Sequence, residues 1–401
     1  MSKTLWRSYE IKNDFSYRDL LQYINEKNGI EKVIKDEDAF KTVKKLIVSL
    51  VGKKDIEIIP SEIEIERGNE KTNVSDVKFE DEKEIIRNIK NKGGEWSVSL
   101  YTSGTTGSPK RVEHNLKTLT KSVKVGDRYS ENVWALAYPP SHIAGLQVLF
   151  QALMNKNTIV YIFESDPHEI SSLIKKYRIT HISATPTFYR TRIQKLSGTF
   201  KSVERVTLGG ERFERGLKSE IAKTFPNAEM RNIYALTEAG SLLYSAEESF
   251  KIPNDKEGKF RVSEKNRLHI HKSLLGDSED IEMNGEWYDT GDIVEENEGR
   301  LRFVGRDSDF FNVGGYRVNP HKVEEIINNL EEVSGSVVQP RDSSVTGNIP
   351  IVIVEPVEGI DDNAAVRAVK QAVTDLPEWE RPRQIQVVST LEKSRTGKRV
   401  R

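Results

Sequence analysis

Tyr101-Thr102-Ser103-Gly104-Thr105-Thr106-Gly107-Ser108-Pro109-Lys110 is the most informative stretch of this chain. It combines hydroxyl side chains, two glycines and a lysine, and it directly follows residues 96–100, whose alternating apolar residues predict a strand. Such a strand and loop can hold phosphate, because glycine lets backbone N–H groups approach the oxygens and the lysine adds charge. A Walker A loop does not fit, because Pro109 stands where its second glycine belongs. On composition alone, the alternative is a flexible surface loop.

Four later segments accompany this loop, and together they carry a family resemblance. The loop resembles the phosphate-binding signature of the adenylate-forming superfamily, which includes acyl-CoA synthetases, peptide-synthetase adenylation domains and luciferases. Each later segment is similar to a further signature of that superfamily, and the order along the chain is the same. The four segments are Tyr234-Ala235-Leu236-Thr237-Glu238, Tyr288-Asp289-Thr290-Gly291-Asp292, Gly305-Arg306-Asp307-Ser308-Asp309 and Ser394-Arg395-Thr396-Gly397-Lys398.

The composition is that of a globular protein with no nucleic-acid or membrane signal. The chain has 401 residues, 36% of them hydrophobic and 31% charged, so it has room for two or three domains. A formal net charge of −1 gives no field that favours nucleic acid or an anionic membrane. The absence of cysteine excludes a thiol nucleophile, disulfides and cysteine-ligated zinc.

Neither a signal peptide nor a membrane span is expected from the apolar segments. The first ten residues contain no apolar run of signal-peptide length. The most apolar region, residues 133–154, is interrupted by Pro139-Pro140, Ser141-His142 and Gln147, so we expect it to be buried protein. We therefore expect a cytoplasmic protein that binds neither a membrane nor nucleic acid.

The periodicity predicts an α/β fold with a mixed sheet over residues 96–305. Strands are predicted at 158–163, 181–184 and 203–208, with a helix at 170–177 between the first two. Residues 1–95 are more charged, with a helix predicted at 40–51 and short strands at 56–59 and 63–65.

A second domain is predicted beyond Arg306. Helices at 323–330 and 364–373 alternate with strands at 351–355 and 385–388, which describes a compact α+β module. We therefore expect a large layered α/β N-terminal domain with mixed sheets over residues 1–305, and a small, mobile α+β C-terminal domain over residues 309–401. The resemblance implies a hinge at Ser308 and a shortened first subdomain.

The resemblance implies an ATP-dependent adenylation of a carboxylic acid. Both reactants are anions, so the site must neutralise charge and align them, and no protein nucleophile is needed. The loop would bind the phosphates of ATP through Thr102, Ser103, Gly104, Thr105, Thr106, Gly107 and Lys110. Thr237 would bind a phosphate oxygen and Glu238 would hold Mg²⁺, which prefers carboxylate and phosphate oxygens. The alternative for Thr237-Glu238 is an ordinary capped helix N-terminus.

Three further residues are implied at the nucleoside. Tyr234 would offer an aromatic face to adenine, or it is simply a core tyrosine at a strand end. Asp292 would accept hydrogen bonds from the ribose hydroxyls, for which a carboxylate has two acceptor oxygens, or it is a turn residue. Arg306 would reach the ribose or the phosphate from the hinge side. Ala235 stands where the family usually has glycine, and we expect it to be tolerated if its φ is negative.

Lys398 is implied as the catalytic lysine, bridging the carboxylate and the nucleotide as charge develops between them. The alternative is a basic tail, since Arg399 and Arg401 lie beside it. For the second half-reaction the small domain would rotate, so that the glycine-rich residues 313–318 line a pantetheine tunnel.

The acyl pocket is predicted around His142, Gly145 and Thr185. His142 resembles the family's substrate-proximal position, although a lone histidine among apolar residues is more often structural. Gly209, Gly210 and Glu211 would form another wall near adenine and the acyl group. No aspartate occurs between Tyr138 and Gly145, which argues against an α-amino acid substrate.

We therefore predict an AMP-forming acid–thiol ligase that uses ATP and Mg²⁺ and passes the acyl group to CoA or to the phosphopantetheine of an acyl carrier protein. Two alternatives stay open: an enzyme that stops at the acyl-adenylate, and a non-catalytic protein that binds ATP or the acyl-adenylate. The sequence leaves the small carboxylic acid and the oligomeric state undetermined.

Overall fold

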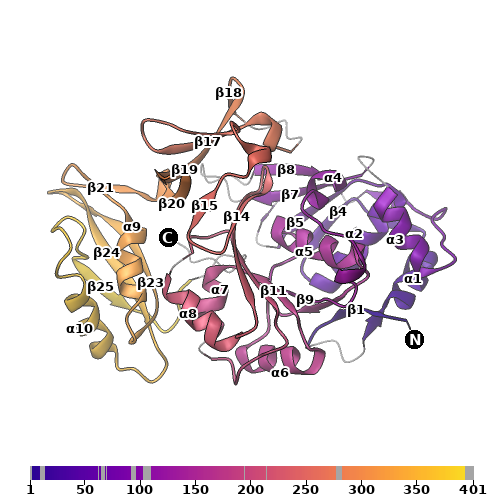
Figure 1. Ribbon diagram of the computed structural model, residues 1–401, viewed down its shortest axis with the longest axis horizontal. Helices are drawn as coiled ribbons and strands as arrows, with labels where there is room; N and C mark the ends of the chain where they lie inside the picture. Colours follow the sequence, from indigo (N-terminus) through magenta and orange to yellow (C-terminus); the bar gives the residue numbers. More distant parts are fainter. Residues whose placement is uncertain are drawn as a thin grey trace.

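A large mixed α/β part and a smaller α+β part make up the protein (Figure 1). The computed structural model describes residues 2–9, 14–61, 63–64, 68, 70–91, 96–102, 110–193, 195–213, 215–276 and 282–392. The smaller part lies at the left of Figure 1 in orange and yellow, and the N-terminus lies at the opposite end.

The central sheet has eight strands, of which six run parallel. Its strands read as continuous apolar runs because helices cover both faces, and all four residues of β10 are buried. The two outer strands, β14 and β2, pair antiparallel. In spatial order the strands are β14 (Gly240–Ser245), β13 (Glu229–Leu236), β12 (Arg205–Gly209), β11 (His181–Ala184), β9 (Val133–Leu136), β10 (Thr158–Tyr161), β1 (Thr4–Arg7) and β2 (Phe15–Ser16).

Different helices pack on the two faces of the central sheet. One hydrophobic core joins the sheet to three of them, and a second joins it to five helices and to the next sheet. The first set is α6 (Pro167–Tyr177), α7 (Pro186–Ile193) and α8 (Arg215–Thr224). The second set is α1 (Tyr17–Glu26), α2 (Ala39–Gly52), α3 (Glu82–Asn91), α4 (Leu116–Thr120) and α5 (Ile143–Met154).

Helix α6 shows how local sequence sets these boundaries. Asp166 caps its N-terminus by accepting from the Glu169 backbone, and the Glu169 side chain accepts from the Asp166 backbone in return. Pro167 occupies the first helical position, where no N–H is needed. The helix ends at Arg178, which adopts the left-handed conformation.

The second sheet presents the phosphate-loop segment. Its strands are β4 (Val33–Asp36), β5 (Ile56–Pro60), β7 (Ser97–Thr102) and β8 (Lys110–Asn115), and a separate pair is formed by β3 (Gly29–Glu31) and β6 (Lys71–Asn73). β7 and β8 pair antiparallel, and their last described pair is Thr102 opposite Lys110.

A third, antiparallel sheet follows the central one along the chain. It packs on β13 and β14 through its own hydrophobic core. Its strands are β15 (Ser249–Lys251), β20 (Arg300–Arg306), β19 (Trp287–Asn297), β17 (Arg267–His271) and β16 (Phe260–Val262), with β18 (Met283–Asn284) beside β19. Short 3-10 helices in the described residues are η1 (Asp127–Tyr129), η2 (Asn254–Lys256), η3 (Lys272–Leu274) and η4 (Asp307–Asp309).

The small part begins after η4 and has a core of its own, formed by residues 311–385. Two helices pack on a three-stranded sheet, and a short hairpin precedes them. The elements are β21 (Phe311–Val313), β22 (Tyr316–Val318), α9 (Pro320–Asn328), β23 (Val333–Ser343), β24 (Gly347–Pro356), α10 (Asp362–Ala372) and β25 (Gln384–Val387).

Most of the predicted elements are confirmed by the structure. β10, α6, β11, β12, α2 and β5 lie where the periodicity predicts them, as do α9, β24, α10 and β25. The strand predicted at 63–65 is wrong for the described residues 63 and 64, which belong to no strand. The sequence missed β23 and the hairpin of β21 and β22.

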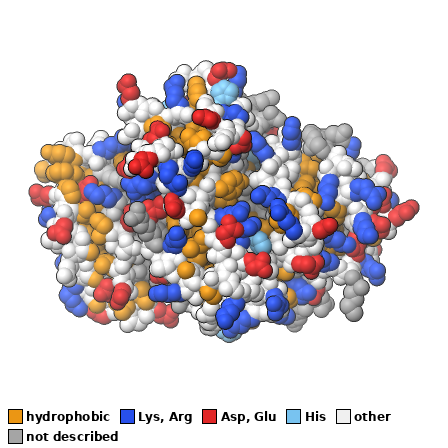
Figure 2. Space-filling model, viewed as in Figure 1, with side chains coloured by type: hydrophobic (Ala, Val, Ile, Leu, Met, Phe, Trp, Pro, Cys, Tyr) orange, Lys and Arg blue, Asp and Glu red, His pale blue; other side chains and the backbone are white. Residues whose placement is uncertain are grey.

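The apolar region 133–154 folds into β9 and α5, and nine of the twelve residues of α5 are buried. In the described ranges, none of the helices has both the length and the apolar character needed to cross a membrane. Basic and acidic side chains are mixed over the face shown in Figure 2, as expected from a net charge of −1.

His114 on β8 is a buried titratable group without a visible role in binding. It is 1% exposed, and neither ring nitrogen has a hydrogen-bond partner among the described residues. Burial lowers the pKa of His114 to about 4, well below the ordinary value of about 6.5. Between these two pH values the unfolded chain binds the proton more readily than the folded protein.

Acidification should therefore destabilise the fold through His114. Its contribution is complete above pH 6.5 and is lost as the pH falls towards 4, by about 2 kcal/mol at pH 5. We expect His114→Leu to reduce the drop in melting temperature between pH 7 and pH 5, while exposed His168→Leu leaves it unchanged. An unchanged drop in His114→Leu would contradict this account.

Candidate active site

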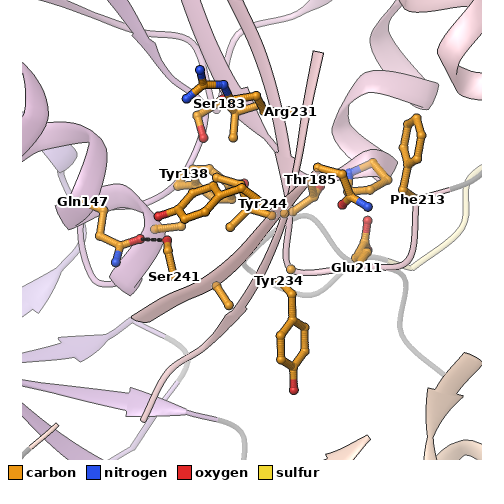
Figure 3. A pocket seen from close by; sticks show the side chains of 18 of the residues that line it. Tyr138, Gln147, Ser183, Thr185, Glu211, Phe213, Arg231, Tyr234, Ser241 and Tyr244 are labelled. Carbon is orange, nitrogen blue, oxygen red and sulfur yellow. Dashed lines mark hydrogen bonds between the residues drawn. The ribbon is translucent and has the colours of Figure 1, made fainter. Parts of the chain in front are cut away.

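A cavity of about 890 Å³ lies between the central sheet, α5 and the small part of the chain (Figure 3). Residues from distant regions of the sequence line it. One part, at Gly209, lies at the carboxyl ends of the parallel strands, where open α/β sheets bind their ligands, and the cavity extends along the sheet to Arg205 at the start of β12. The predicted site residues that line this cavity are His142, Thr185, Gly209, Gly210, Glu211, Tyr234, Thr237, Asp292 and Arg306.

Asp292 is the centre of a polar cluster at one end of the cavity. It lies on β19 directly opposite Arg306 of β20, and the Arg306 Nε lies 3.3 Å from its Oδ1. The Tyr234 hydroxyl, from the central sheet, donates to its Oδ2 at 2.6 Å. Asp292 is therefore a strand residue with two fixed partners, and the alternative of a simple turn residue is wrong.

Burial raises the pKa of the Asp292 carboxyl, although the charge of Arg306 and the hydrogen bond from Tyr234 act in the opposite direction. Burial, together with the charge of Asp292, also raises the pKa of Tyr234 well above its usual range. The tyrosine therefore keeps its proton and donates a hydrogen bond to the carboxylate. A further ligand hydroxyl would find the acceptor already oriented.

The ring of Tyr234 is partly covered. Phe303 of β20 stacks on it with ring centroids 3.8 Å apart and an interplanar angle of 27°. Both residues line the cavity, so an adenine ring would meet an aromatic pair instead of a lone tyrosine. Sequence reasoning missed Phe303, because only the pairing of β19 with β20 brings it to this place.

Thr237 and Glu238 lie in the turn that joins β13 to β14, so the helix N-terminus considered for them is wrong. Thr237 lines the cavity. Glu238 is not among the lining residues, and its Oε1 accepts from the Tyr288 hydroxyl at 3.2 Å. Ala235 is not among the described residues with positive φ, which satisfies the condition for tolerating a methyl group there.

His142 is the N-cap of α5 and lines the cavity. Its Nδ1 accepts from the Ala144 N–H at 3.2 Å, so the neutral ring carries its proton on Nε2. The ring stacks on Tyr138 at an interplanar angle of 13°. The Nε2–H donor of His142 is thereby held in place at the start of α5.

Gly145 does not line the cavity, although it was predicted as a pocket residue. A Cβ atom at this position would lie 2.4 Å from the Pro139 carbonyl oxygen. Glycine is therefore required so that the first turn of α5 can pack against the preceding loop.

Thr185 and Glu211 organise the start of α7. The Thr185 hydroxyl accepts from the Phe188 N–H at 3.0 Å, as a helix cap does. The Glu211 carboxylate accepts from the Thr187 N–H at 2.8 Å and from the Thr187 hydroxyl at 3.0 Å. Glu211 thus fixes the loop of Gly209 and Gly210, the latter with a φ of +81°, to the next wall of the cavity.

Several predicted residues lie outside the described residues. They are Ser103, Gly104, Thr105, Thr106 and Gly107 of the phosphate loop, and Lys398. The flanking residues Thr102 and Lys110 are described by their backbone alone.

The small part of the chain closes one side of the cavity. Asp309, His321, Glu324 and Val337 line it, and the His321 Nε2 lies 2.8 Å from the Asp309 Oδ2. An ion pair of 2.8 Å joins Arg212 of the large part to Glu325 of α9. The predicted hinge residue Ser308 is exposed in η4, between the two parts.

The glycine-rich hairpin of β21 and β22 lies away from the cavity. Gly314 and Gly315 both have positive φ, 57° and 88°, as a tight hairpin turn requires. Next to them, Tyr316 is 53% exposed and stacks on Trp379. Residues 311–318 do not line the cavity in this arrangement.

Sequence reasoning also missed the contact between Gln147 and Ser241 in the cavity. The Ser241 hydroxyl donates to the Gln147 Oε1 at 3.2 Å (Figure 3). A signal was present on the helix, since Ala144, Gln147, Val148 and Gln151 follow its period and all face the cavity.

Comparison with known proteins identifies the same two parts. The family profile described as "AMP-binding enzyme" matches residues 15–262, and the profile described as "AMP-binding enzyme C-terminal domain" matches residues 322–398. The 2-succinylbenzoate–CoA ligase of Listeria monocytogenes serotype 4b (strain F2365) is 26% identical over 334 residues, which cover 76% of this chain and 69% of the relative. The enzyme of the same name from Bacillus subtilis (strain 168) is 26% identical over 294 residues, which cover 64% of this chain and 59% of the relative.

Solved structures share the fold over nearly the whole chain. The o-succinylbenzoate CoA synthetase of Bacillus subtilis in complex with ATP and magnesium has a TM-score of 0.69 at 17% identity, with 99% of this chain and 95% of that chain covered. An anthranilate CoA ligase in complex with anthranoyl-AMP has a TM-score of 0.71 at 16% identity, with 99% and 92% covered. The predicted α/β fold with a smaller C-terminal part is confirmed.

Asp292→Asn should weaken binding of ATP and AMP about 10- to 100-fold, because hydrogen bonds to a charged group are worth about 1.5–3 kcal/mol. Calorimetry with AMP measures this without turnover. The matched control is Asp289→Asn on the same strand, since Asp289 pairs with Arg267 at 2.9 Å and does not line the cavity. Equal affinities in Asp292→Asn and the wild type would remove Asp292 from the nucleotide site.

Proposed function

Because this chain belongs to the AMP-binding enzyme family, we propose that it activates a carboxylic acid with ATP in this cavity and transfers the acyl group to CoA. The predicted family and the predicted enzyme class, an AMP-forming acid–thiol ligase, are confirmed by the matched profiles and by the CoA ligases among its relatives. The residue roles and the acceptor are proposals.

The observation that carries this proposal is the convergence of a nucleoside-type site and an acyl-type site in one cavity. Asp292, Tyr234 and Arg306 form the polar end, and His142 with the Gly209–Glu211 loop forms the wall beyond it. Thr237, which follows Tyr234 in the sequence and precedes Asp292, lines the same cavity. A carboxylate and an α-phosphate could therefore meet here in a fixed orientation.

In the first step a carboxylate oxygen attacks the α-phosphorus, and the bond from that phosphorus to the bridging oxygen of pyrophosphate breaks. In the second step the thiol sulfur attacks the acyl carbon, AMP leaves, and the thiol proton goes to solvent. Asp292 would hold the ribose, Arg306 would hold the ribose or the phosphate, and Thr237 would hold a phosphate oxygen.

Glu238 would hold the magnesium ion together with oxygens of the nucleotide. The described residues contain no cluster of three or more acidic or histidine side chains that could hold a metal alone. One carboxylate fits this role, since Mg²⁺ is usually bound by one or two carboxylates and by substrate phosphates. The ion would neutralise charge on the leaving pyrophosphate.

We also propose that the phosphate loop, residues 102–110, binds the β- and γ-phosphates, and that Lys398 stabilises charge between the carboxylate and the nucleotide. Two facts support these assignments. Thr102 and Lys110 are paired at the end of a hairpin in the second sheet, and the C-terminal profile matches as far as residue 398.

We propose two domains, residues 1–305 and 309–401, with Ser308 as the hinge. The separate core of the small part supports this division. Rotation about the hinge would exchange the face that now closes the cavity for the hairpin of Gly314 and Gly315. An acyl carrier protein as the acceptor in place of CoA and a cytoplasmic location also stay proposals.

Pyrophosphate release tests the adenylation step directly. With Mg-ATP, pooled carboxylic acids and hydroxylamine as the acyl trap, the wild type should release pyrophosphate only when an acid is present. Lys398→Ala should lower this rate by about 100-fold or more, since it removes charge stabilisation specific to the transition state. Its affinity for ATP should change little, because the phosphate loop and Asp292 remain.

Lys393→Ala is the matched control, as it removes a lysine from the same segment of sequence. Formation of an acyl-CoA on addition of CoA would then identify the acceptor. ATP binding without acid-dependent release would instead favour the alternative of a protein that binds nucleotide without catalysis.

A further inference from the structure

The acyl part of the cavity follows the rows of the central sheet. Pairing places Trp134, His181 and Arg205 side by side in one row, and Leu136, Ser183, Thr207 and Arg231 in the next. Alternate residues face the same side, and Trp134, Ser183, Arg205, Thr207 and Arg231 all line the cavity. Figure 3 shows Ser183 and Arg231 together at one end, with Tyr234 pointing away at the other.

The register also gives the length of this channel. Gly209 pairs with Ile233, two residues along the strands from the row of Thr207 and Arg231 and closer to the proposed nucleotide end. Two residues along a strand advance about 7 Å, so the Arg231 row lies about 7 Å and the Arg205 row about 13 Å from Gly209.

The far end of the channel carries an excess of positive charge. The Arg231 Nε and the Arg205 Nη2 each lie 2.9 Å from a different oxygen of Glu229. The hydrogen bond from Arg231, more than that from Arg205, holds the pKa of Glu229 below its usual range. Two guanidinium groups therefore share a single carboxylate, and the formal charge of these three side chains together is +1.

Other groups at this end are also donors or cations. The indole Nε1 of Trp134 is buried without a hydrogen-bond partner among the described residues. Lys121 and Lys124 line the cavity, and the Lys124 backbone is held by Gln151 and Asn155. The described lining also contains Glu248, which follows Glu247, and the Glu247 carbonyl accepts from the side chain of Asn232, next to Arg231. The other charged residues of the lining are Arg190, Glu211, Arg212, Asp292, Arg302, Arg306, Asp309 and Glu324.

We propose that the acid activated by this protein carries a second anionic group, such as a carboxylate, at the end remote from the activated carboxyl. Arg231 and Arg205 bind this group from backbone positions about 7 and 13 Å along the sheet from Gly209. The proposal rests on the proposed function, because it takes the Gly209 end as the place of the activated carboxyl. A planar guanidinium fork suits a carboxylate, which it can bind through two parallel hydrogen bonds.

An acyl chain with a neutral end would bind less well for a physical reason. It would displace water from the guanidinium groups and from the hydroxyls of Ser183 and Thr207 without replacing the lost hydrogen bonds. Polar groups of this kind discriminate strongly against ligands that lack the complementary group.

The test uses stable sulfamate analogues of an acyl-adenylate, so that binding is measured without catalysis. Each analogue carries an acyl chain of six, eight or ten carbons that ends in a carboxylate, and its matched partner ends in the methyl ester of that carboxylate. Calorimetry should show at least 10-fold tighter binding of the carboxylate form at one or more chain lengths, and the ratio should shrink as salt is added.

Arg231→Gln should bring this ratio below about 3-fold, and Arg231→Lys should retain part of it. Arg205→Gln offers a second variant if the first fails to fold. Arg300→Gln is the control, since Arg300 pairs with Glu247 at 2.9 Å and does not line the cavity. A ratio near one at every chain length in the wild type overturns the inference, as does a ratio that survives both substitutions.

Failure of the proposed function would be visible separately. If the carboxylate analogues bind better through Arg231 but no acid promotes pyrophosphate release, the inference of a second anion site is supported and the proposed ligase activity is refuted. If pyrophosphate is released equally well with monocarboxylic acids and with diacids of the same length, the proposed ligase activity is supported and the inference of a second anion site is refuted.

Discussion

The parallel register of the central sheet is the constraint on which the rest of this site depends. Backbone pairing of β9, β11, β12 and β13 brings residues that are nearly a hundred positions apart into common rows. Because side chains alternate along a strand, every second residue of each strand faces α5, and the residues of one such row face the same side. A shift of one residue in any of these strands would turn Thr207 or Arg231 to the opposite face, where α6, α7 and α8 pack. The backbone hydrogen bonds of the sheet therefore fix which side chains line the cavity.

A second constraint joins the central sheet to the antiparallel one. The pairing of β19 with β20 puts Asp292 opposite Arg306, and Tyr234 reaches the same carboxylate from β13. The stacking of Phe303 of β20 on Tyr234 of β13 joins the same two sheets a second time, through packing. The polar end of the cavity thus lies where the two sheets share one hydrophobic core, so each sheet contributes groups to it while neither contains the whole site.

Sequence alone predicted the residues whose chemistry is local, and it missed those created by pairing. The strands at β10 and β11 were predictable because continuous apolar runs need burial on both faces. The signature residues Thr237, Asp292 and Arg306 were found from their neighbours in the chain. β23 was missed because Pro340 and the polar residues after it interrupt the strand pattern, which an edge strand tolerates. Phe303 and Arg231 carry no local signal, since register alone brings them to the cavity.

The contact of the small part with the cavity wall also bears on the fate of an activated intermediate. An acyl-adenylate is a mixed anhydride, and water would destroy it if the cavity stayed open. Asp309, His321 and Glu324 line one side of the cavity, so in the proposed reaction such a species would be sheltered until the two parts separate. Separation must break the Arg212–Glu325 ion pair and expose its partly buried groups. In the proposed reaction, the strength of this contact would set how long the intermediate stays enclosed before the acceptor thiol reaches it.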